Sequence, residues 1–122
     1  MQFMHQCVNC HSSLSVAKLR CPSCAISFSG SFALPRLARL APPQQHLVEH
    51  LVLAAGNLKQ MAASLEVSYP TLRKRLDELV LALDGLRQSD EARAAALLED
   101  VAAGSTSPES AARLIREMHG AI

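Results

Sequence analysis

The sequence lacks tryptophan, and only 3% of its 122 residues are aromatic. A core of this chain must therefore be built from aliphatic side chains, above all Leu, Ala and Val, a composition typical of small helical proteins. An excess of one charge sign is also missing, since the net charge is +1 at pH 7. This near-neutrality excludes a globally basic nucleic-acid-binding surface, and the length allows one ordinary domain or two very small ones.

Long apolar runs are absent as well. No stretch approaches the roughly 20 residues that a membrane-spanning helix needs. The N-terminus has neither the basic nor the apolar region of a secretory signal. We therefore expect a cytoplasmic protein without membrane contact. In that reducing compartment, clustered cysteines favour metal binding over disulfides.

The charged residues are unevenly distributed. Residues 1–43 carry four basic and no acidic side chains, whereas residues 44–88 carry five of each sign. Residues 89–122 carry three basic against six acidic side chains. A basic front and an acidic tail favour different partners for the two ends.

All four cysteines precede residue 25, in the pattern C-x2-C-x10-C-x2-C. Two residues between cysteines allow one tight turn to direct both thiolates at one ion, and two such pairs complete the closed shell of structural Zn²⁺. Short strands over Leu14–Val16 and Ala25–Phe28 would complete a zinc ribbon. A redox dithiol would need a βαβ context that the sequence lacks, whereas His5 and His11 stay open as alternative ligands. The predicted ligands of the single zinc ion are Cys7, Cys10, Cys21 and Cys24.

Each knuckle usually has glycine after its second cysteine, where the backbone φ is positive. His11 and Ala25 occupy these positions here. We expect His11 to tolerate the left-handed conformation and Ala25 to be mildly strained or differently folded. Because some thirty residues bury little apolar surface, zinc binding is expected to fold this segment.

The apolar periodicity predicts helices from Pro43 to the end of the chain. The first should begin at Pro42 or Pro43, after the poor N-cap residue Ala41, and end at Gly56. Its expected apolar stripe is Leu47, Val48, Leu51, Val52 and Ala55.

Further helices follow from capping residues. Asn57 should cap a helix over 58–65, and Ser68 a helix over 69–83 with Leu72, Leu76, Leu79 and Leu83 inward. A fourth, about 90–103, should stop at Gly104, and Ser107-Pro108 should open a fifth. The fold class is thus mainly α. The expected parts are a zinc ribbon (1–30), a linker (31–43), a helix-turn-helix domain (44–88) and a C-terminal helical hairpin (89–122).

The helices 58–65 and 69–83, joined by a three-residue turn, have helix-turn-helix spacing. The N-terminal end of the second helix is expected to reach base edges, while its arginines and those of the linker contact phosphates. The predicted DNA-binding residues are Ser68, Tyr69, Thr71, Arg73, Lys74, Arg75, Arg36 and Arg39.

Two acidic residues oppose this interpretation. Asp77 and Glu78 follow Arg73 and Lys74 by four residues, so both bases have ion-pair partners on their own helix. With no net charge over 44–88, the motif has little of the electrostatic attraction that dominates nucleic-acid affinity. The alternative is a protein-binding adaptor that uses the ribbon and the C-terminal helices without direct DNA contact.

One motif suggests catalysis. His46-Leu47-Val48-Glu49-His50 matches the H-x-x-E-H pattern of inverted zincins. The two histidines share a helix face, but no third ligand and no room for a substrate cleft is evident, so we interpret them as solvent-facing. Neither a Gly-rich phosphate loop nor a nucleophile with a base is present, and we do not expect an enzyme.

Several blocks of sequence point to a known family. They include Cys21-Pro22-Ser23-Cys24, Leu34-Pro35-Arg36-Leu37-Ala38-Arg39-Leu40, Gly56-Asn57-Leu58-Lys59 and Ser68-Tyr69-Pro70-Thr71. With these, the chain resembles the bacterial family called domain of unknown function 2089 over about residues 7–84. The resemblance implies a zinc ribbon joined to a helix-turn-helix, and brings no activity with it.

Two further resemblances concern partners. The helix-turn-helix is similar to those of Fis-type and sigma-factor proteins, which implies contact with DNA or the transcription machinery. The C-terminal hairpin is similar to short helical oligomerisation modules, and its apolar stripes suggest a homodimer. The sequence thus predicts a zinc-containing helix-turn-helix protein that binds duplex DNA and regulates transcription.

Overall fold

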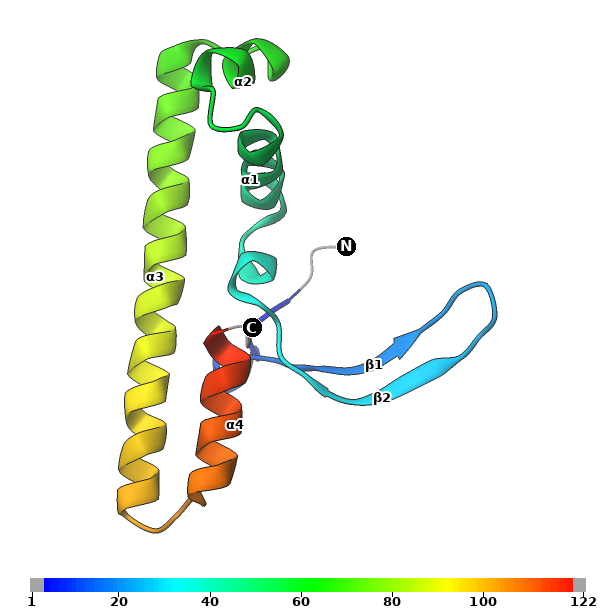
Figure 1. The fold of residues 1–122 in the computed structure, drawn as a ribbon, viewed down its shortest axis with the longest axis vertical. Coiled ribbons are helices and arrows are strands. Elements are labelled where there is room, and N and C mark those ends of the chain that lie inside the picture. The colour runs from blue at the N-terminus through cyan, green and yellow to red at the C-terminus, as the bar shows by residue number, and fades with distance from the viewer. Residues whose placement is uncertain (1–3, 120–122) are drawn as a thin grey trace. The chain divides into compact units, whose positions relative to one another are not determined.

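The computed structural model describes residues 4–119, which fold mainly into helices (Figure 1). The elements, in chain order, are β1 (Val16–Arg20), β2 (Ser27–Phe32), the 3-10 helix η1 (Arg36–Arg39), α1 (Pro42–Leu53), α2 (Leu58–Ser64), α3 (Tyr69–Ala102) and α4 (Pro108–His119). Residues 36–95 form one compact unit, and the described residues before 36 and after 95 form another. The predicted fold class, mainly α with a small cysteine-bearing sheet near the N-terminus, is confirmed.

The start of α1 is set by its prolines and by a glutamine. Proline at the first helical position loses no hydrogen bond, and α1 begins at Pro42 as predicted. Ala41 has no side-chain group to cap the helix. Instead, Oε1 of Gln44 accepts a 3.2 Å hydrogen bond from the Ala41 backbone N–H. Gln45 donates a 2.8 Å hydrogen bond to the Leu40 carbonyl, which fixes the path of the chain into the helix.

The helices α1 and α2 end with the same backbone motif, a Schellman turn. At the end of α1, the N–H of Gly56 donates to the Leu51 carbonyl at 3.0 Å, and Ala55 has a φ of 50°. At the end of α2, Glu66 takes the equivalent position with a φ of 55°. The left-handed residues that terminate α1 are therefore Ala55 and the predicted Gly56, which has a φ of 79°.

The predicted N-caps of α2 and α3 are confirmed. Oδ1 of Asn57 accepts a hydrogen bond from the Gln60 N–H at 3.2 Å. Oγ of Ser68 lies 3.4 Å from the Thr71 N–H, which donates to it. The turn between α2 and α3 is thus fixed at both ends by local hydrogen bonds.

The core of the unit 36–95 is aliphatic, as the scarcity of aromatic residues predicted. Met61 of α2 and Leu72 of α3 are fully buried and join the two helices of the helix-turn-helix. Val52, expected in the apolar stripe of α1, is instead 71% exposed. The buried residues of this core are Leu40, Leu47, Ala54, Met61, Ala62, Leu72 and Leu79.

The predicted break between a helix over 69–83 and one over 90–103 is wrong, because α3 runs through it without interruption. Gly85 costs the helix only about 1 kcal/mol relative to alanine. Around it, Arg87 donates to Asp84 at 2.8 Å and to Glu91 at 3.3 Å, ion pairs at the spacings that support helices. The loop expected between two helices is therefore a helical segment with its own side-chain support.

After α3 the chain reverses at Gly104, with a φ of 76°, and α4 begins at Pro108 as predicted. Ala111 of α4 is 2% exposed. The helical hairpin has an apolar groove of about 370 Å³. It is lined mainly by Leu98 and Val101 of α3 and Ile115 of α4. The hairpin thus retains apolar surface at its exposed side.

In the N-terminal segment, β1 and β2 pair in antiparallel fashion, with Leu19 opposite Phe28 and a bulge between Val16 and Lys18. The strands lie later in the chain than predicted. Every residue of β2 is exposed, and Phe28 is 61% exposed. This sheet therefore has no apolar core of its own to stabilise it.

Among residues 4–119, no helix has both the length and the apolar character to cross a membrane.

Candidate metal centre and nucleic-acid interface

The two cysteine pairs lie in two turns of the same construction. In the first, the N–H of His11 donates to the Cys7 carbonyl at 2.9 Å, and in the second the N–H of Ala25 donates to the Cys21 carbonyl at 2.9 Å. His11 has a φ of 58° and Ala25 a φ of 64°. Both residues are thus in the left-handed conformation that a zinc knuckle requires at this position, and Ala25 carries the expected strain.

A second pair of backbone hydrogen bonds closes each turn. The N–H of Cys7 donates to the Ser12 carbonyl at 2.9 Å, and that of Cys21 to the Ile26 carbonyl at 2.8 Å. The loop from each first cysteine therefore spans the same number of residues and has the same hydrogen bonds. Two such turns fit the half-sites of a four-sulfur zinc centre.

Hydrogen bonds within the turns favour thiolates. The pKa of Cys10 is lowered by hydrogen bonds from the side chain and the backbone of Ser12. The pKa of Cys21 is lowered by the backbone N–H groups of Cys24 and Ser23. Because the thiolate is the form that binds metals, these turns favour the ligand form of the sulfur.

The structure brings together the members of each cysteine pair but not the two pairs. Each turn holds its own pair, Cys7 with Cys10 and Cys21 with Cys24, through the backbone hydrogen bonds given above. Within residues 4–119, no three His, Cys, Asp or Glu side chains gather closely enough to hold one ion. The alternative ligands His5 and His11 consequently complete neither pair.

The N-terminal end of α3 is the exposed part of the helix-turn-helix. Tyr69 is 53% exposed, and Lys74 is exposed without an ion-pair partner among the described residues. Arg73 pairs with Asp77 at 3.4 Å, as the spacing predicted, with both side chains 60% exposed. The expected pair between Lys74 and Glu78 does not form.

Ser68 and Thr71 hold the helix end together. Oγ of Ser68 and Oγ1 of Thr71 form a 2.8 Å hydrogen bond, in addition to the capping contact with the Thr71 N–H. Both residues are exposed. They organise the N-terminus of α3, whose free N–H groups and dipole attract anions such as phosphate.

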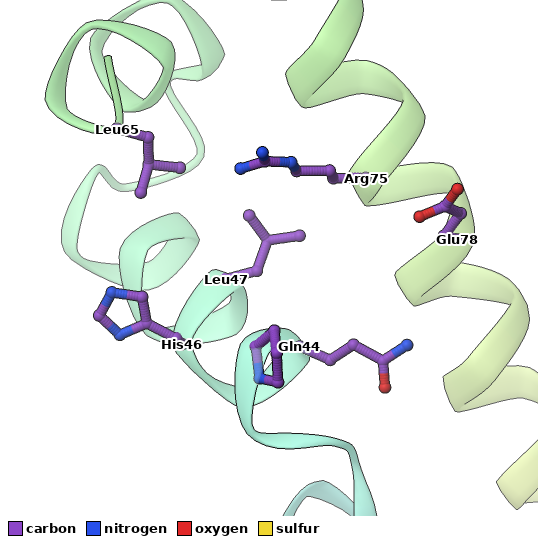
Figure 2. Close-up of a pocket in the computed structure, with 7 residues that line it drawn as sticks. Gln44, His46, Leu47, Leu65, Arg75 and Glu78 are labelled. Atoms are coloured by element: carbon purple, nitrogen blue, oxygen red, sulfur yellow. The ribbon is translucent and has the colours of Figure 1, made fainter. Parts of the chain in front are cut away.

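Arg75 points to the side of α3 rather than to its exposed end. Figure 2 shows its guanidinium directed from α3 toward Leu65, above Leu47 of α1. These residues line a cavity of about 460 Å³, together with Gln44 and Glu78. Arg75 is exposed on this side of the helix, and its predicted role was a phosphate contact rather than a base contact.

The two linker arginines are directed into the protein. Nη2 of Arg39 lies 2.5 Å from Oδ2 of Asp90, and Nε of Arg36 lies 2.9 Å from the same oxygen. Arg39 and Asp90 are 8% and 3% exposed, so this ion pair is buried. The prediction that Arg39 contacts DNA phosphate is not compatible with this burial, and Arg36 is largely occupied by the same carboxylate.

The sequence did not predict the positions of two residues of this region, Asp90 and Lys59. Asp90 was expected only as part of an acidic tail, and nothing in its local pattern indicates two arginines more than fifty residues away. Lys59 lies exposed at the start of α2, without an ion pair among the described residues. A position there suits a phosphate contact, because the first helix of the motif crosses the DNA backbone.

Two family models match the chain. The zinc ribbon of domain of unknown function 2089 (DUF2089) matches residues 7–38, and the helix-turn-helix of DUF2089 matches residues 40–86. The first covers both cysteine turns and the sheet, and the second covers α1, α2 and the first half of α3. No curated protein and no solved structure matched the chain.

Proposed function

Because the chain belongs to the family called domain of unknown function 2089, which joins a zinc ribbon to a helix-turn-helix, we propose that it is a DNA-binding regulator of transcription. We place this activity in the cytoplasm. The proposal depends on one observation above all. The first two turns of α3, held on α2 by the buried pair Met61 and Leu72, present an exposed helix end with polar and basic side chains.

In this proposal, the N-terminal end of α3 enters the major groove. Tyr69 and Lys74 reach base edges, and Arg73 exchanges Asp77 for a phosphate. Such an exchange is inexpensive, since an exposed ion pair is worth only about 0–1 kcal/mol. Ser68 and Thr71 keep the helix N-terminus ordered, and Lys59 adds a backbone contact from α2.

The ribbon holds one zinc ion through Cys7, Cys10, Cys21 and Cys24. The support for this is the matched construction of the two turns and the zinc-ribbon family match over residues 7–38. A sheet whose second strand is entirely exposed needs another source of stability. Zinc binding supplies about 10–16 kcal/mol in small zinc domains.

We further propose that the protein acts as a homodimer. Leu98, 60% exposed, borders the apolar groove of the C-terminal hairpin, which a second copy would cover. Two copies add two half-sites, and this would compensate for the low net charge of each helix-turn-helix. Light-scattering mass over a range of concentrations tests this, and a constant monomer mass would refute it.

The DNA proposal is tested by fluorescence anisotropy of a random duplex with the zinc-loaded protein at low and moderate salt. We expect binding that weakens with salt, with a log–log slope of about −0.9 per phosphate contacted. The double variant Arg73→Ala/Lys74→Ala should bind much more weakly and with a smaller slope. Both side chains are exposed, so the fold should be retained.

The matched control is Arg93→Ala/Arg113→Ala, which removes the same charge from exposed positions outside the matched helix-turn-helix. It should bind as the unmodified protein does. Equal losses of duplex affinity in the two double variants would show that binding depends on net charge alone. Absence of binding at low salt would end the DNA proposal.

A second candidate is an adaptor that binds protein through the ribbon and the C-terminal helices. The observation in its favour is the engagement of arginines by acids: Arg73 with Asp77, and Arg39 with Asp90. A nuclease-resistant, stoichiometric protein partner together with no duplex binding would support the adaptor. Recovery of nucleic acid alone would contradict it.

A further inference from the structure

Two histidines on one face of α1 point the same ring nitrogen at each other. Nε2 of His46 lies 3.0 Å from Nε2 of His50, one helical turn away. The ring centroids are 4.5 Å apart and the rings are nearly perpendicular, at 85°. The His46 side chain is 66% exposed, so solutes can reach the pair. These are the outer histidines of the H-x-x-E-H motif, for which the proposed function has no role.

The Nε2–Nε2 distance matches a particular coordination geometry. Imidazole nitrogens bind divalent transition metals at about 2.0–2.1 Å. Two such bonds at a right angle place their nitrogens about 2.8–3.0 Å apart, whereas a tetrahedral angle places them about 3.3–3.4 Å apart, by the same bond lengths. The observed 3.0 Å is the length of the hydrogen bond between the two nitrogens, and it also fits neighbouring positions of a square-planar or octahedral ion. Nitrogen sites of that geometry are typical of Cu²⁺ and Ni²⁺.

Glu49 lies beside the opposite nitrogen of the first ring. Its Oε2 is 4.0 Å from Nδ1 of His46. A carboxylate at this side favours the tautomer with the proton on Nδ1, which leaves the Nε2 lone pair for a metal. In the hydrogen-bonded pair, one Nε2 carries a proton. On metal binding that proton moves to Nδ1 of its own ring through solvent, so neutral rings release no net proton.

We propose that His46 and His50 form a surface site for Ni²⁺ or Cu²⁺, separate from the cysteine turns, with Glu49 as the positioning residue of His46. The two Nε2 atoms occupy neighbouring coordination positions, and water occupies the others. Two protein ligands make this a weaker and more exchangeable site than a four-sulfur centre. It prefers Ni²⁺ over Zn²⁺, because zinc favours the wider tetrahedral angle.

Ni²⁺ titration of the zinc-loaded, full-length chain tests the proposal, by calorimetry and by the paramagnetic broadening of histidine ring NMR signals. We expect one Ni²⁺ per chain, with the His46 and His50 signals broadened first. His46→Gln and His50→Gln should each weaken binding at least about tenfold, since even outer-sphere partners of metal ligands typically contribute 10–100-fold. Glu49→Gln should weaken it by less, because its contact is long and exposed.

The matched control is His5→Gln, which removes a histidine from outside α1 and should leave the affinity for Ni²⁺ unchanged. A zinc indicator reports whether Ni²⁺ displaces zinc from the cysteines. Zinc release equal to the Ni²⁺ bound would overturn the proposal, as would unchanged binding by His46→Gln. Tighter binding of Zn²⁺ than of Ni²⁺ at the histidines would overturn the assigned geometry. None of these results depends on whether the protein binds DNA.

Discussion

Arg39 and Asp90, fifty-one residues apart, form a buried ion pair with an Nη2–Oδ2 distance of 2.5 Å. The pair attaches η1 to the middle of α3, and Arg36 binds the same carboxylate oxygen at 2.9 Å. Two buried or half-buried guanidinium groups thus share one acid. Among residues 4–119, Nε of Arg39 is buried without a hydrogen-bond partner, and its guanidinium pairs with the Asp90 carboxylate through Nη2.

Asp90→Asn should therefore be strongly destabilising. Removal of one partner leaves an uncompensated buried charge, which costs about 3–5 kcal/mol. Chemical denaturation followed by circular dichroism measures the change in the free energy of unfolding. The control is Asp84→Asn, which removes an exposed acid paired with Arg87 on the same helix and should cost less than about 1 kcal/mol. Similar losses from both variants would contradict the buried role of Asp90.

The same pair predicts a dependence on pH. Burial alone would raise the pKa of Asp90, but the hydrogen bonds from Arg39 and Arg36 outweigh it and lower the pKa. An acid with a lowered folded-state pKa contributes stability above its unfolded pKa, about 3.9, and loses it as the pH falls below that value. The stability difference between the unmodified chain and Asp90→Asn should thus shrink as the pH falls below about 4. A difference that does not change with pH would contradict this.

Local sequence patterns predicted the features that depend on residues close by in the chain. The caps Asn57 and Ser68, the proline start of α1 and the left-handed His11 all depend on neighbours within five residues. The pairing of Asp90 with Arg39 depends on tertiary packing, which no local pattern encodes. Two arginines assigned to DNA therefore have a structural role instead.

The continuity of α3 shows a second limit of prediction from local sequence. Separate helices over 69–83 and about 90–103 were predicted, and Gly85, whose residue type lowers helix propensity, lies in the segment between them. In the structure this segment is helical, with ion pairs around Arg87 and with Asp90 paired to Arg39 of η1. A propensity difference near 1 kcal/mol is easily outweighed by tertiary contacts.

Gly85→Ala should consequently stabilise the protein by up to about 1 kcal/mol, the propensity difference in a helix interior. Apart from the adjoining backbone of α3, a β-carbon at Gly85 meets no atom of the described residues within 4 Å, so no clash opposes the gain. Gly104→Ala is the control, since Gly104 has a φ of 76° and alanine there is strained. Thermal unfolding should show opposite shifts for the two variants. A loss of stability from Gly85→Ala would argue against an uninterrupted α3.

Glu66→Gly should also stabilise the protein, although substitution by glycine usually lowers the free energy of unfolding. Glu66 has a φ of 55° in the turn between α2 and α3, a conformation that costs a non-glycine residue about 1–2 kcal/mol. Relief of this strain exceeds the added entropy of the unfolded chain, about 0.5–1 kcal/mol. The net gain should be roughly 0.5–1 kcal/mol in the free energy of unfolding. Ala63→Gly, at an exposed position within α2, is the control and should be destabilising by about 1 kcal/mol.

Removal of zinc should affect the two parts of the chain differently. The sheet of β1 and β2 has no apolar core, with Leu19 52% and Phe28 61% exposed, so chelation should abolish the dispersed NMR signals of residues 7–32. The unit 36–95 has its own buried core around Met61 and Leu72 and should keep its helical circular dichroism. Cys10→Ser and Cys24→Ser should each reproduce the effect of the chelator, one from each turn, whereas Ser23→Ala should not. A ribbon that keeps its signals after chelation would show that the two turns are stable without a metal, and the zinc assignment would then fail.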